Sequence, residues 1–381
     1  MKLPSKIFVV SHEATYTGAP ILLLNLLHVL KDELNIKFTI FIVRDGDLRN
    51  DFSEVGKVIV FKKAGYAKRK FFLHRLHEFI LSRIILVISV IKSISYPLIF
   101  SNTLINAQVY KYFNFFKKPT VVYVHELSNI IRFYPLKKHI LPLIIKRNYF
   151  FFPSEAVKTY LTEQFAINTN RLFKLNYFIP DLNIMSSGQE PHKTELVKIG
   201  PSLVVCGMGV ASPRKGTDIF IEVASIVCNQ RKDIRFVWIG GFANTDFEKQ
   251  YYTLIEKYNI SHAFQFTGKL HPIAAKKQLS KSDLLFLSSR EDPYPLVVLE
   301  AAMYGIPSIV FKDGGGITDF VNIKSGWIVN DFSPELVSEI IINIIQDDLS
   351  IKGKMARQYY KVKHESKELV ISQFLNCIDK I

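Results

Sequence analysis

The chain has 381 residues, of which 48% are hydrophobic and three are cysteines. This length exceeds one ordinary domain and suits two domains of about 150–200 residues, each able to bury a core. Cys206, Cys228 and Cys377 show neither paired nor metal-site spacing. The composition therefore excludes a disulfide-stapled secreted scaffold and favours a reducing compartment with buried, apolar thiols.

Positive charge is concentrated in the first half of the chain, within a formal net charge of +15. Residues 1–200 hold 28 basic and 14 acidic side chains, net +14, whereas residues 201–381 hold 21 and 20, net +1. A basic half predicts an anionic partner, which is a nucleic acid, a membrane surface or a phosphorylated substrate. Charge that only keeps the chain in solution is the alternative.

The sequence offers no signal peptide and no membrane-spanning segment. Met1–Ala14 has only a short apolar run before His12 and Glu13, which predicts a first strand. The longest apolar run lies within Phe79–Ile91, contains Arg83, and is too short and too charged to span a bilayer. We expect a cytoplasmic protein, either in solution or peripheral on the inner face of the membrane.

Short apolar segments alternate with helical patterns in the first half. A helix is predicted at Ile21–Leu30, between the first two strands. Segments rich in Val, Ile and Phe and bounded by polar or turn residues predict the strands. They are Ile7–Ser11, Lys37–Val43, Lys57–Phe61, Leu98–Asn102, Thr120–His125 and Phe150–Pro153. This alternation favours a parallel sheet covered by helices on both faces.

The second half repeats the scheme after a polar linker at Asp181–Gly200. Its predicted strands are Leu203–Gly207, Arg235–Gly240, Phe264–Gly268, Leu284–Ser288, Ser308–Phe311 and Trp327–Val329. Its predicted helices are Asp218–Asn229, Phe247–Tyr258, Pro272–Ser280, Leu296–Tyr304 and Pro334–Gln346, the last capped by Ser333. Two α/β domains would bind ligands in crevices at the carboxyl ends of their strands.

Residues 71–91 predict one long helix with apolar residues every three or four positions. Basic residues flank its start, at Lys68, Arg69, Lys70 and Arg75. A basic amphipathic helix can lie on an anionic membrane surface. A helix packed on the core, with a solvated polar face, is the other interpretation.

The strongest chemical signal is the segment Ser288–Ala302, where a strand, an acidic loop and a helix follow one another. Glu291 and Asp292 lie in the loop, and Glu300 lies inside an apolar helix that ends before Gly305. Carboxylates at such positions accept hydrogen bonds from sugar hydroxyls. A solvated Glu300 is the alternative, and the apolar neighbours of this residue weaken it.

Two glycine-containing loops predict a place for phosphate. Arg214, Lys215 and Gly216 precede a helix, where cations and the helix N-terminus both favour an anion. The glycine spacing differs from that of a P-loop. Gly314–Gly316 follow a strand, so that backbone N–H groups can approach a ligand closely. A plain surface turn is the alternative for this second loop.

The first half carries two weaker signals. Gly18 stands between the first strand and its helix, without the glycine pattern of dinucleotide-binding oxidoreductases. His125 and Glu126 end a strand, where a histidine can contact a sugar or polarise a reacting group, or be purely structural. The sequence has no motif of metal-binding spacing, so no metal is expected.

Together these pieces resemble the retaining glycosyltransferase family 4. Ser289–Ala301 is similar to the acidic motif of that family, and Arg214–Gly216 is similar to its phosphate-binding turn. Gly314–Gly316, followed by Asp319 and Phe320, looks like its glycine-rich loop. Gly18 and the His125–Glu126 pair also fit its N-terminal motifs. The resemblance covers nearly the whole chain and is densest over residues 203–330.

The resemblance implies an α/β protein of the GT-B fold, with two Rossmann-like domains facing across a cleft. Residues 1–180 would bind the acceptor and residues 195–360 the nucleotide-sugar. Residues 361–381 would form a helix that crosses back to the first domain.

The resemblance also implies roles for single residues. Lys215 and Arg214 would neutralise the diphosphate, and Glu300 would hold the ribose. Asp292 or Glu291, with the amides of Gly315–Ile317, would hold the transferred sugar, and His125 would lie at the reaction centre. The chain departs from the family at Val210, Asp292 and Asp319, where an Arg and two Glu residues are usual.

We therefore expect a retaining hexosyltransferase that uses a UDP- or GDP-linked sugar and no metal or other cofactor. The acceptor would be a glycan or a lipid-linked molecule of surface polysaccharide biosynthesis. A sugar-nucleotide epimerase of the same architecture is the alternative function. A nucleic-acid-binding protein would also suit the charge, but the sequence has no RNA- or DNA-binding motif, so no nucleic-acid partner is expected.

Overall fold

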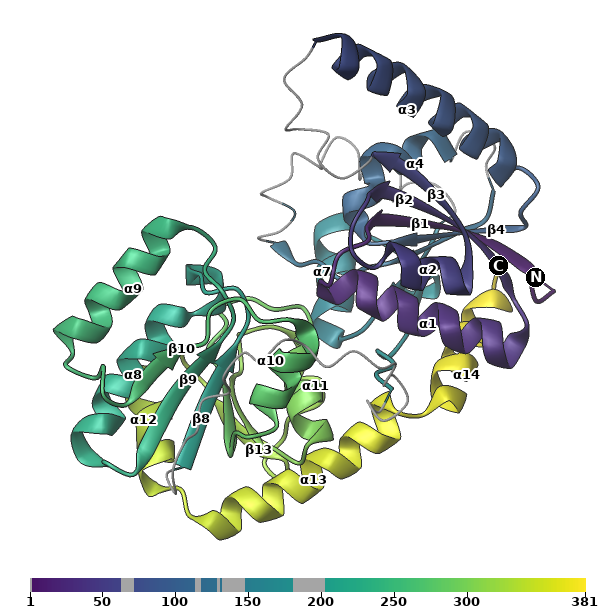
Figure 1. Cartoon of the computed structure of the whole chain (residues 1–381). Helices are drawn as coiled ribbons and strands as arrows, with labels where there is room; N and C mark the ends of the chain where they lie inside the picture. Colours follow the sequence, from purple (N-terminus) through teal and green to yellow (C-terminus); the bar gives the residue numbers. More distant parts are fainter. Residues whose placement is uncertain (1, 63–71, 114–117, 129–130, 132–147, 181–202) are drawn as a thin grey trace. The chain divides into compact units, whose positions relative to one another are not determined.

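The computed structural model describes residues 2–62, 72–113, 118–128, 131, 148–180 and 203–381 (Figure 1). The chain divides into two compact units. Unit 1 comprises residues 1–179 and 366–381, and unit 2 comprises residues 180–365. The predicted linker at Asp181–Gly200 lies outside the described residues.

Unit 1 is built on a seven-stranded parallel sheet in the order β3-β2-β1-β4-β5-β6-β7. Ile7, Phe8, Val9 and Val10 of β1 are all fully buried, because helices cover both faces of a parallel sheet. The strands are β1 Lys6–Glu13, β2 Lys37–Arg44, β3 Gly56–Lys62, β4 Leu98–Asn102, β5 Thr120–Tyr123, β6 Tyr149–Phe152 and β7 Leu172–Lys174. All the predicted strands of this half are present, and the three-residue β7 is additional.

The helices of unit 1 fill the connections between these strands and include the end of the chain. They are α1 Gly18–Leu34, α2 Arg49–Val55, α3 Phe72–Ser93, η2 Leu104–Asn106, α4 Ala107–Phe113, α7 Glu155–Phe165, η4 Thr169–Arg171 and α14 Lys367–Ile378. Ser366 caps α14, whose Phe374 is fully buried. Gln373 of α14 accepts a hydrogen bond from the backbone N–H of Asn176 at 2.8 Å.

Unit 2 is built on a six-stranded parallel sheet in the order β10-β9-β8-β11-β12-β13. The strands are β8 Leu203–Met208, β9 Ile234–Ile239, β10 Phe264–Phe266, β11 Leu284–Leu287, β12 Ser308–Phe311 and β13 Gly326–Val329. The helices are η6 Pro213–Lys215, α8 Thr217–Gln230, α9 Thr245–Lys257, α10 Pro272–Leu279, α11 Leu296–Met303, η7 Gly316–Asp319, α12 Pro334–Asn343 and α13 Gln346–His364. Phe220 of α8 packs on Phe236 and Trp238 of β9 and on Phe286 of β11, which places the core under α8.

Two boundaries near the end of unit 2 differ from the prediction. The helix predicted at Pro334–Gln346 ends at Asn343, and Ile344 and Ile345 are extended before α13 begins. Arg231 donates to the carbonyls of Ile342 and Ile344, which stabilises this break. The boundary expected between residues 360 and 361 falls instead at 365–366, because α13 continues to His364.

Helix α3 departs from the core-packed interpretation of its sequence. Ile80, Ile84, Val87 and Ile91, which form part of the apolar pattern, are each at least 50% exposed. The interpretation as a helix packed by this face is therefore wrong for these residues. No helix within the described ranges combines the length and apolar character that crossing a membrane requires.

The strand orders place a topological switch point in each unit. In unit 1 the order reverses between β1 and β4, and in unit 2 between β8 and β11. Ligands of open α/β sheets bind at the carboxyl ends of the strands beside such a point. The loops after β1, β4, β8 and β11 are therefore where functional side chains are expected.

Candidate functional site

The loop after β8 presents Lys215 beside the switch point of unit 2. Gly216 has a φ of +66°, and a Cβ atom there would lie 1.8 Å from the carbonyl oxygen of Ser288. Ser288 in turn donates its hydroxyl to the carbonyl of Lys215 at 2.9 Å. The stem of Lys215 runs over Gly209, where a Cβ would lie 3.3 Å from the Cε of the lysine. Close backbone packing thus fixes the base of this side chain.

Lys215 forms an ion pair with Asp292, the predicted acid of the loop after β11. Both side chains are largely buried, with exposed fractions of 16% and 11%. An ion pair shielded from water is stronger than one on the surface, provided that both groups stay paired. The structure therefore joins two residues that lie 77 positions apart in the sequence.

Asp292 is also joined to the glycine-rich loop after β12 through backbone contacts. Its N–H donates to the carbonyl of Gly314 at 2.8 Å, and its carbonyl accepts from the N–H of Gly316 at 3.3 Å. Gly315 between them has a φ of +131°, and a Cβ there would lie 1.8 Å from the carbonyl oxygen of Asp292. Only glycine fits this position, and Ile317 is buried in the η7 turn that follows. We call Lys215, Asp292 and Gly314–Gly316 the Lys215 cluster.

Arginines brace the loops after β8 and β11. The guanidinium of Arg214 donates to the carbonyl of Glu291 at 2.9 Å. Arg290 donates to both carboxylate oxygens of Asp218, at 2.6 and 2.8 Å, and its N–H donates to the carbonyl of Arg214. The Asp218–Arg290 pair was not predicted, since nothing in the local sequence connects two residues so far apart.

Glu300 lies on α11, in the helix that follows the acidic loop. Its carboxylate pairs with Lys276 of α10 at 3.4 Å, with a side chain only 14% exposed. Burial raises the pKa of Glu300, and the ammonium of Lys276 opposes this shift. Glu300 is thus a shielded carboxylate, paired with Lys276 rather than with Lys215.

His125 follows β5 in unit 1, and both of its ring nitrogens are hydrogen-bonded. Nε2 lies 2.9 Å from the side-chain oxygen of Asn102, whose amide nitrogen donates to the carbonyl of Ala19. Nε2 therefore carries the proton, and Nδ1 accepts from the hydroxyl of Tyr177 at 3.0 Å. Burial lowers the pKa of His125 to about 3, so the ring is neutral. The histidine links the ends of β4 and β5 to the segment after β7.

The neighbouring Glu126 is a buried carboxylate, 2% exposed. It accepts hydrogen bonds from the backbone N–H groups of Leu104 and His125, at 3.1 and 2.8 Å. Burial raises its pKa, and these N–H groups oppose the shift. Glu126 therefore ties the loop after β5 to the start of η2, at the switch point of unit 1.

A neutral His125 has a consequence for its titration that can be measured. Because folding lowers the pKa of His125, the ring stays unprotonated in the folded protein at pH values at which the unfolded chain binds a proton. The contribution of the neutral His125 ring to the free energy of unfolding is complete above pH 6.5. It is lost progressively as the pH falls toward about 3. We expect the His125 ring resonance, identified by its absence in His125→Gln, not to titrate in NMR spectra between neutral pH and pH 5. A midpoint near 6.5 would contradict the buried, neutral assignment.

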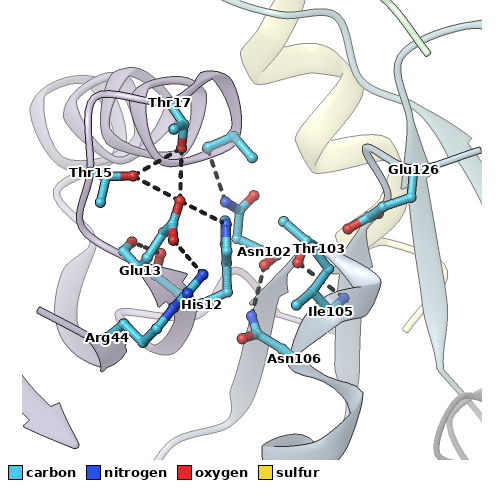
Figure 2. A network of polar contacts seen from close by, with 12 residues as sticks. His12, Glu13, Thr15, Thr17, Arg44, Asn102, Thr103, Ile105, Asn106 and Glu126 are labelled. Carbon is cyan, nitrogen blue, oxygen red and sulfur yellow. Dashed lines mark hydrogen bonds and ion pairs between the residues drawn. The ribbon is translucent and has the colours of Figure 1, made fainter. Parts of the chain in front are cut away.

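Gly18 is the first residue of α1, next to a network centred on Glu13 (Figure 2). The hydroxyls of Thr15 and Thr17 donate to one carboxylate oxygen of Glu13, at 2.7 and 3.0 Å, and Arg44 pairs with the other at 2.6 Å. The hydrogen bond with the His12 side chain is the largest of the effects that lower the pKa of Glu13 to about 2. The network was not predicted, although Glu13 ends the first strand, where functional residues are expected. It fixes the path of the chain into α1.

The structure thus brings together some of the predicted residues and leaves others apart. Lys215, Asp292 and Gly314–Gly316 form one cluster, with Arg214, Glu291 and Ile317 in the same loops. Glu300 has a separate partner. His125 and Gly18 belong to unit 1, where His125 joins a strand-end network and Gly18 begins α1. Within the described residues, no group of three His, Cys, Asp or Glu side chains is arranged to hold a metal ion.

Comparison with known families and proteins gives a consistent result. Residues 189–364 match the family model of glycosyl transferases group 1. A segment of 124 residues is 32% identical to alpha-galactosylglucosyldiacylglycerol synthase of Streptococcus pneumoniae, and covers 32% of this chain and 31% of that protein. A segment of 157 residues is 24% identical to D-inositol 3-phosphate glycosyltransferase of Corynebacterium urealyticum, and covers 40% and 36%. The chain therefore matches about a third of the length of these curated relatives.

Solved structures are similar over nearly the whole chain. Anabaena HepE, crystallised with UDP and glucose, has a TM-score of 0.76 at 17% identity and covers 99% of this chain and 100% of its own. Sucrose-phosphate synthase of Thermosynechococcus elongatus has a TM-score of 0.72 at 15% identity, with 98% of both chains covered. The two α/β units thus have the GT-B fold, which confirms the predicted fold class.

Proposed function

We propose that the chain transfers a sugar from a nucleotide-sugar to an acceptor, since residues 189–364 match the family model of glycosyl transferases group 1. The observation that carries this proposal is the Lys215 cluster. A buried ammonium, a carboxylate and a glycine-rich backbone turn meet at the carboxyl ends of β8, β11 and β12. A nucleotide-sugar contains the complementary groups, an anionic diphosphate beside neutral hydroxyls.

In this proposal Lys215 stabilises the charge that develops when the sugar–phosphate bond breaks. A lysine ammonium has three N–H donors, and the ion pair with Asp292 uses one. The others would bind phosphate oxygens, together with the N–H groups of Gly315 and Ile317 and the guanidinium of Arg214. Donors that are already fixed before the reaction stabilise a transition state without the cost of reorganising it. The packing of Lys215 on Gly209 and Ser288 supports such a fixed donor.

The carboxylates would orient the carbohydrate parts of the donor. Asp292, with Glu291 beside it, would accept a hydrogen bond from a hydroxyl of the transferred sugar. Glu300 would accept hydrogen bonds from the ribose. The pair with Lys276 supports an ionised Glu300, which accepts hydroxyl donors better than a neutral acid. His125 would contact the sugar only after releasing Asn102 or Tyr177. We propose retention of configuration through attack of the acceptor on the same face of the sugar that the diphosphate leaves.

The donor and the acceptor are proposed by class. The complex of HepE with UDP and glucose supports a nucleotide-linked sugar with UDP, or by the same chemistry GDP, as the leaving group. Similarity to a glycolipid synthase supports a lipid-linked acceptor, and a glycan of surface polysaccharide biosynthesis is the other choice. The reported relatives with a stated activity are glycosyltransferases or synthases, so the comparisons do not favour an epimerase.

The first unit would then hold the acceptor, because most of the excess positive charge lies in residues 1–200. We propose that the protein works on the cytoplasmic face of an anionic membrane.

We further propose that transfer needs no metal or other cofactor. Activity that survives a chelator would support this point, and activity restored only by a divalent cation would contradict it.

Ligand binding followed by product analysis tests the proposed function. We expect one or more ligands from a panel of nucleotides and nucleotide-sugars to raise the melting temperature. At a ligand concentration of a hundred times the Kd, binding should add about 2.7 kcal/mol to the free energy of unfolding. Incubation of the best ligand with lipid or glycan acceptors should then release the nucleoside diphosphate and yield a glycosylated product. Stabilisation by none of the panel would contradict the proposal. A free epimerised nucleotide-sugar, formed without acceptor, would favour the epimerase instead.

A further inference from the structure

Helix α3, labelled in Figure 1, carries apolar side chains that are exposed to solvent. Its members recur every three or four residues, which places them along one side of a helix. We call them the outward face of α3: Ile80, Ile84, Val87, Ile88 and Ile91, each 50–60% exposed. Single exposed apolar residues are normal on a protein surface, whereas a contiguous patch marks a binding surface.

The opposite side of the helix is in contact with unit 1, so the exposure is not a consequence of a detached helix. Leu86 is 5% exposed and belongs to the core of the unit. Three small serines, Ser82, Ser89 and Ser93, share the buried side. Each hydroxyl donates to a carbonyl of the preceding turn, at 2.6–2.7 Å. The helix thus buries serines and exposes isoleucines, which reverses the usual pattern of a surface helix.

Basic side chains border this face. Arg83 is exposed, with its guanidinium 4.9 Å from the ring centre of Phe79. Lys92, near the end of α3, adjoins Lys57 of the edge strand β3. Burial and the charge of Lys57 lower the pKa of Lys92. Two ammonium groups side by side repel each other, and a phosphate would relieve that repulsion.

We propose that the outward face of α3 inserts among the headgroups of an anionic membrane, while Lys57, Lys92 and Arg83 contact lipid phosphates. Charge complementarity selects this occupant, since residues 1–200 carry a net charge of +14. Because protein covers the side of Ser82, Leu86, Ser89 and Ser93, lipid can reach only the opposite side. The helix therefore lies along the interface, which is the position of an amphipathic basic helix. This surface deepens the proposed function, since it would bring unit 1 to a lipid-linked acceptor.

Vesicle flotation with the full chain tests the proposal. We expect the protein to float with phosphatidylcholine vesicles that contain phosphatidylglycerol, and to float less without phosphatidylglycerol or in high salt. Ile84→Asp with Ile88→Asp should weaken binding by about tenfold or more, which corresponds to about 1.4 kcal/mol. Lys57→Gln and Lys92→Gln should each weaken it by about fivefold.

Matched controls separate this face from apolar exposure in general. Ile351 and Val362 of α13 are 62% and 68% exposed, so their double substitution by Asp removes equally exposed apolar residues from unit 2. This control should bind vesicles like the original chain. In addition, a tryptophan introduced by Ile88→Trp should show blue-shifted emission with anionic vesicles, whereas Ile351→Trp should not.

Three results would overturn the proposal. They are the absence of binding to anionic vesicles, binding that survives Ile84→Asp with Ile88→Asp, and self-association in sedimentation that these substitutions abolish without any vesicle binding. The two proposals fail separately, because stabilisation by nucleotides needs no lipid. Nucleotide binding without vesicle binding would reject the membrane surface alone. Vesicle binding without nucleotide binding would reject the proposed activity alone.

Discussion

Substitution of Lys215 by alanine is expected to lower kcat by about a hundredfold or more, as for the loss of one well-placed donor to a leaving group. The substitution removes the ammonium and leaves the largely buried carboxylate of Asp292 without its ion-pair partner. Turnover of the nucleotide-sugar at saturating donor, measured as release of nucleoside diphosphate, is the readout.

Lys277→Ala is the control for Lys215→Ala. Lys277 is an exposed lysine on α10 of the same unit, so its removal changes the net charge by the same amount. We expect near-normal kcat for this control. Near-normal kcat for Lys215→Ala would remove Lys215 from the mechanism. Equal loss in both variants would point to net charge rather than to a positioned donor.

Substitution of Gly315 by alanine is expected to affect both stability and activity. The Cβ would lie 1.8 Å from the carbonyl oxygen of Asp292, and the φ of +131° is strained for any other residue. The backbone strain alone costs on the order of 1–3 kcal/mol, and the collision must push Asp292 aside. Displacement by about 1 Å at a reacting centre can cost about a hundredfold in rate. Calorimetric melting and kcat together measure the two effects.

Gly268→Ala separates the collision from the strain. Gly268 also has a positive φ, of +69°, but a Cβ there would have nothing within 4 Å. This variant should lose only the conformational contribution, about 1–2 kcal/mol, and keep its activity. Equal effects of Gly315→Ala and Gly268→Ala would contradict a special role for the contact between Asp292 and Gly315.

The strands of both sheets could be predicted from the sequence because parallel strands are continuous apolar runs. Leu98–Asn102 and Ser308–Phe311 match the predicted segments at both ends. The missed elements depend on distant partners. The break at Ile344 is held by Arg231, and the three residues of β7 become a strand through pairing with β6. The side of α3 that would be buried could not be predicted, since an apolar stripe normally faces a core.

The site was predictable to the level of residue types and loops. The glycines and charged residues at strand ends pointed to the loops that now adjoin each other at the switch point of unit 2. Their pairing was not predictable, since Lys215 could have faced solvent, and Glu300 could have met Lys215 rather than Lys276. Likewise, Asn102 and Tyr177 bind His125 from segments far away in the sequence. Such contacts depend on the packed structure, which local sequence patterns do not determine.

A crystal structure of the protein with a bound nucleotide-sugar tests the central claim most directly, which is that the Lys215 cluster holds a diphosphate. We predict phosphate oxygens within hydrogen-bond distance of the Nζ of Lys215 and of backbone N–H groups in Gly315–Ile317, with a sugar hydroxyl on Asp292. A diphosphate bound elsewhere, with Lys215 contacting only Asp292, would contradict it.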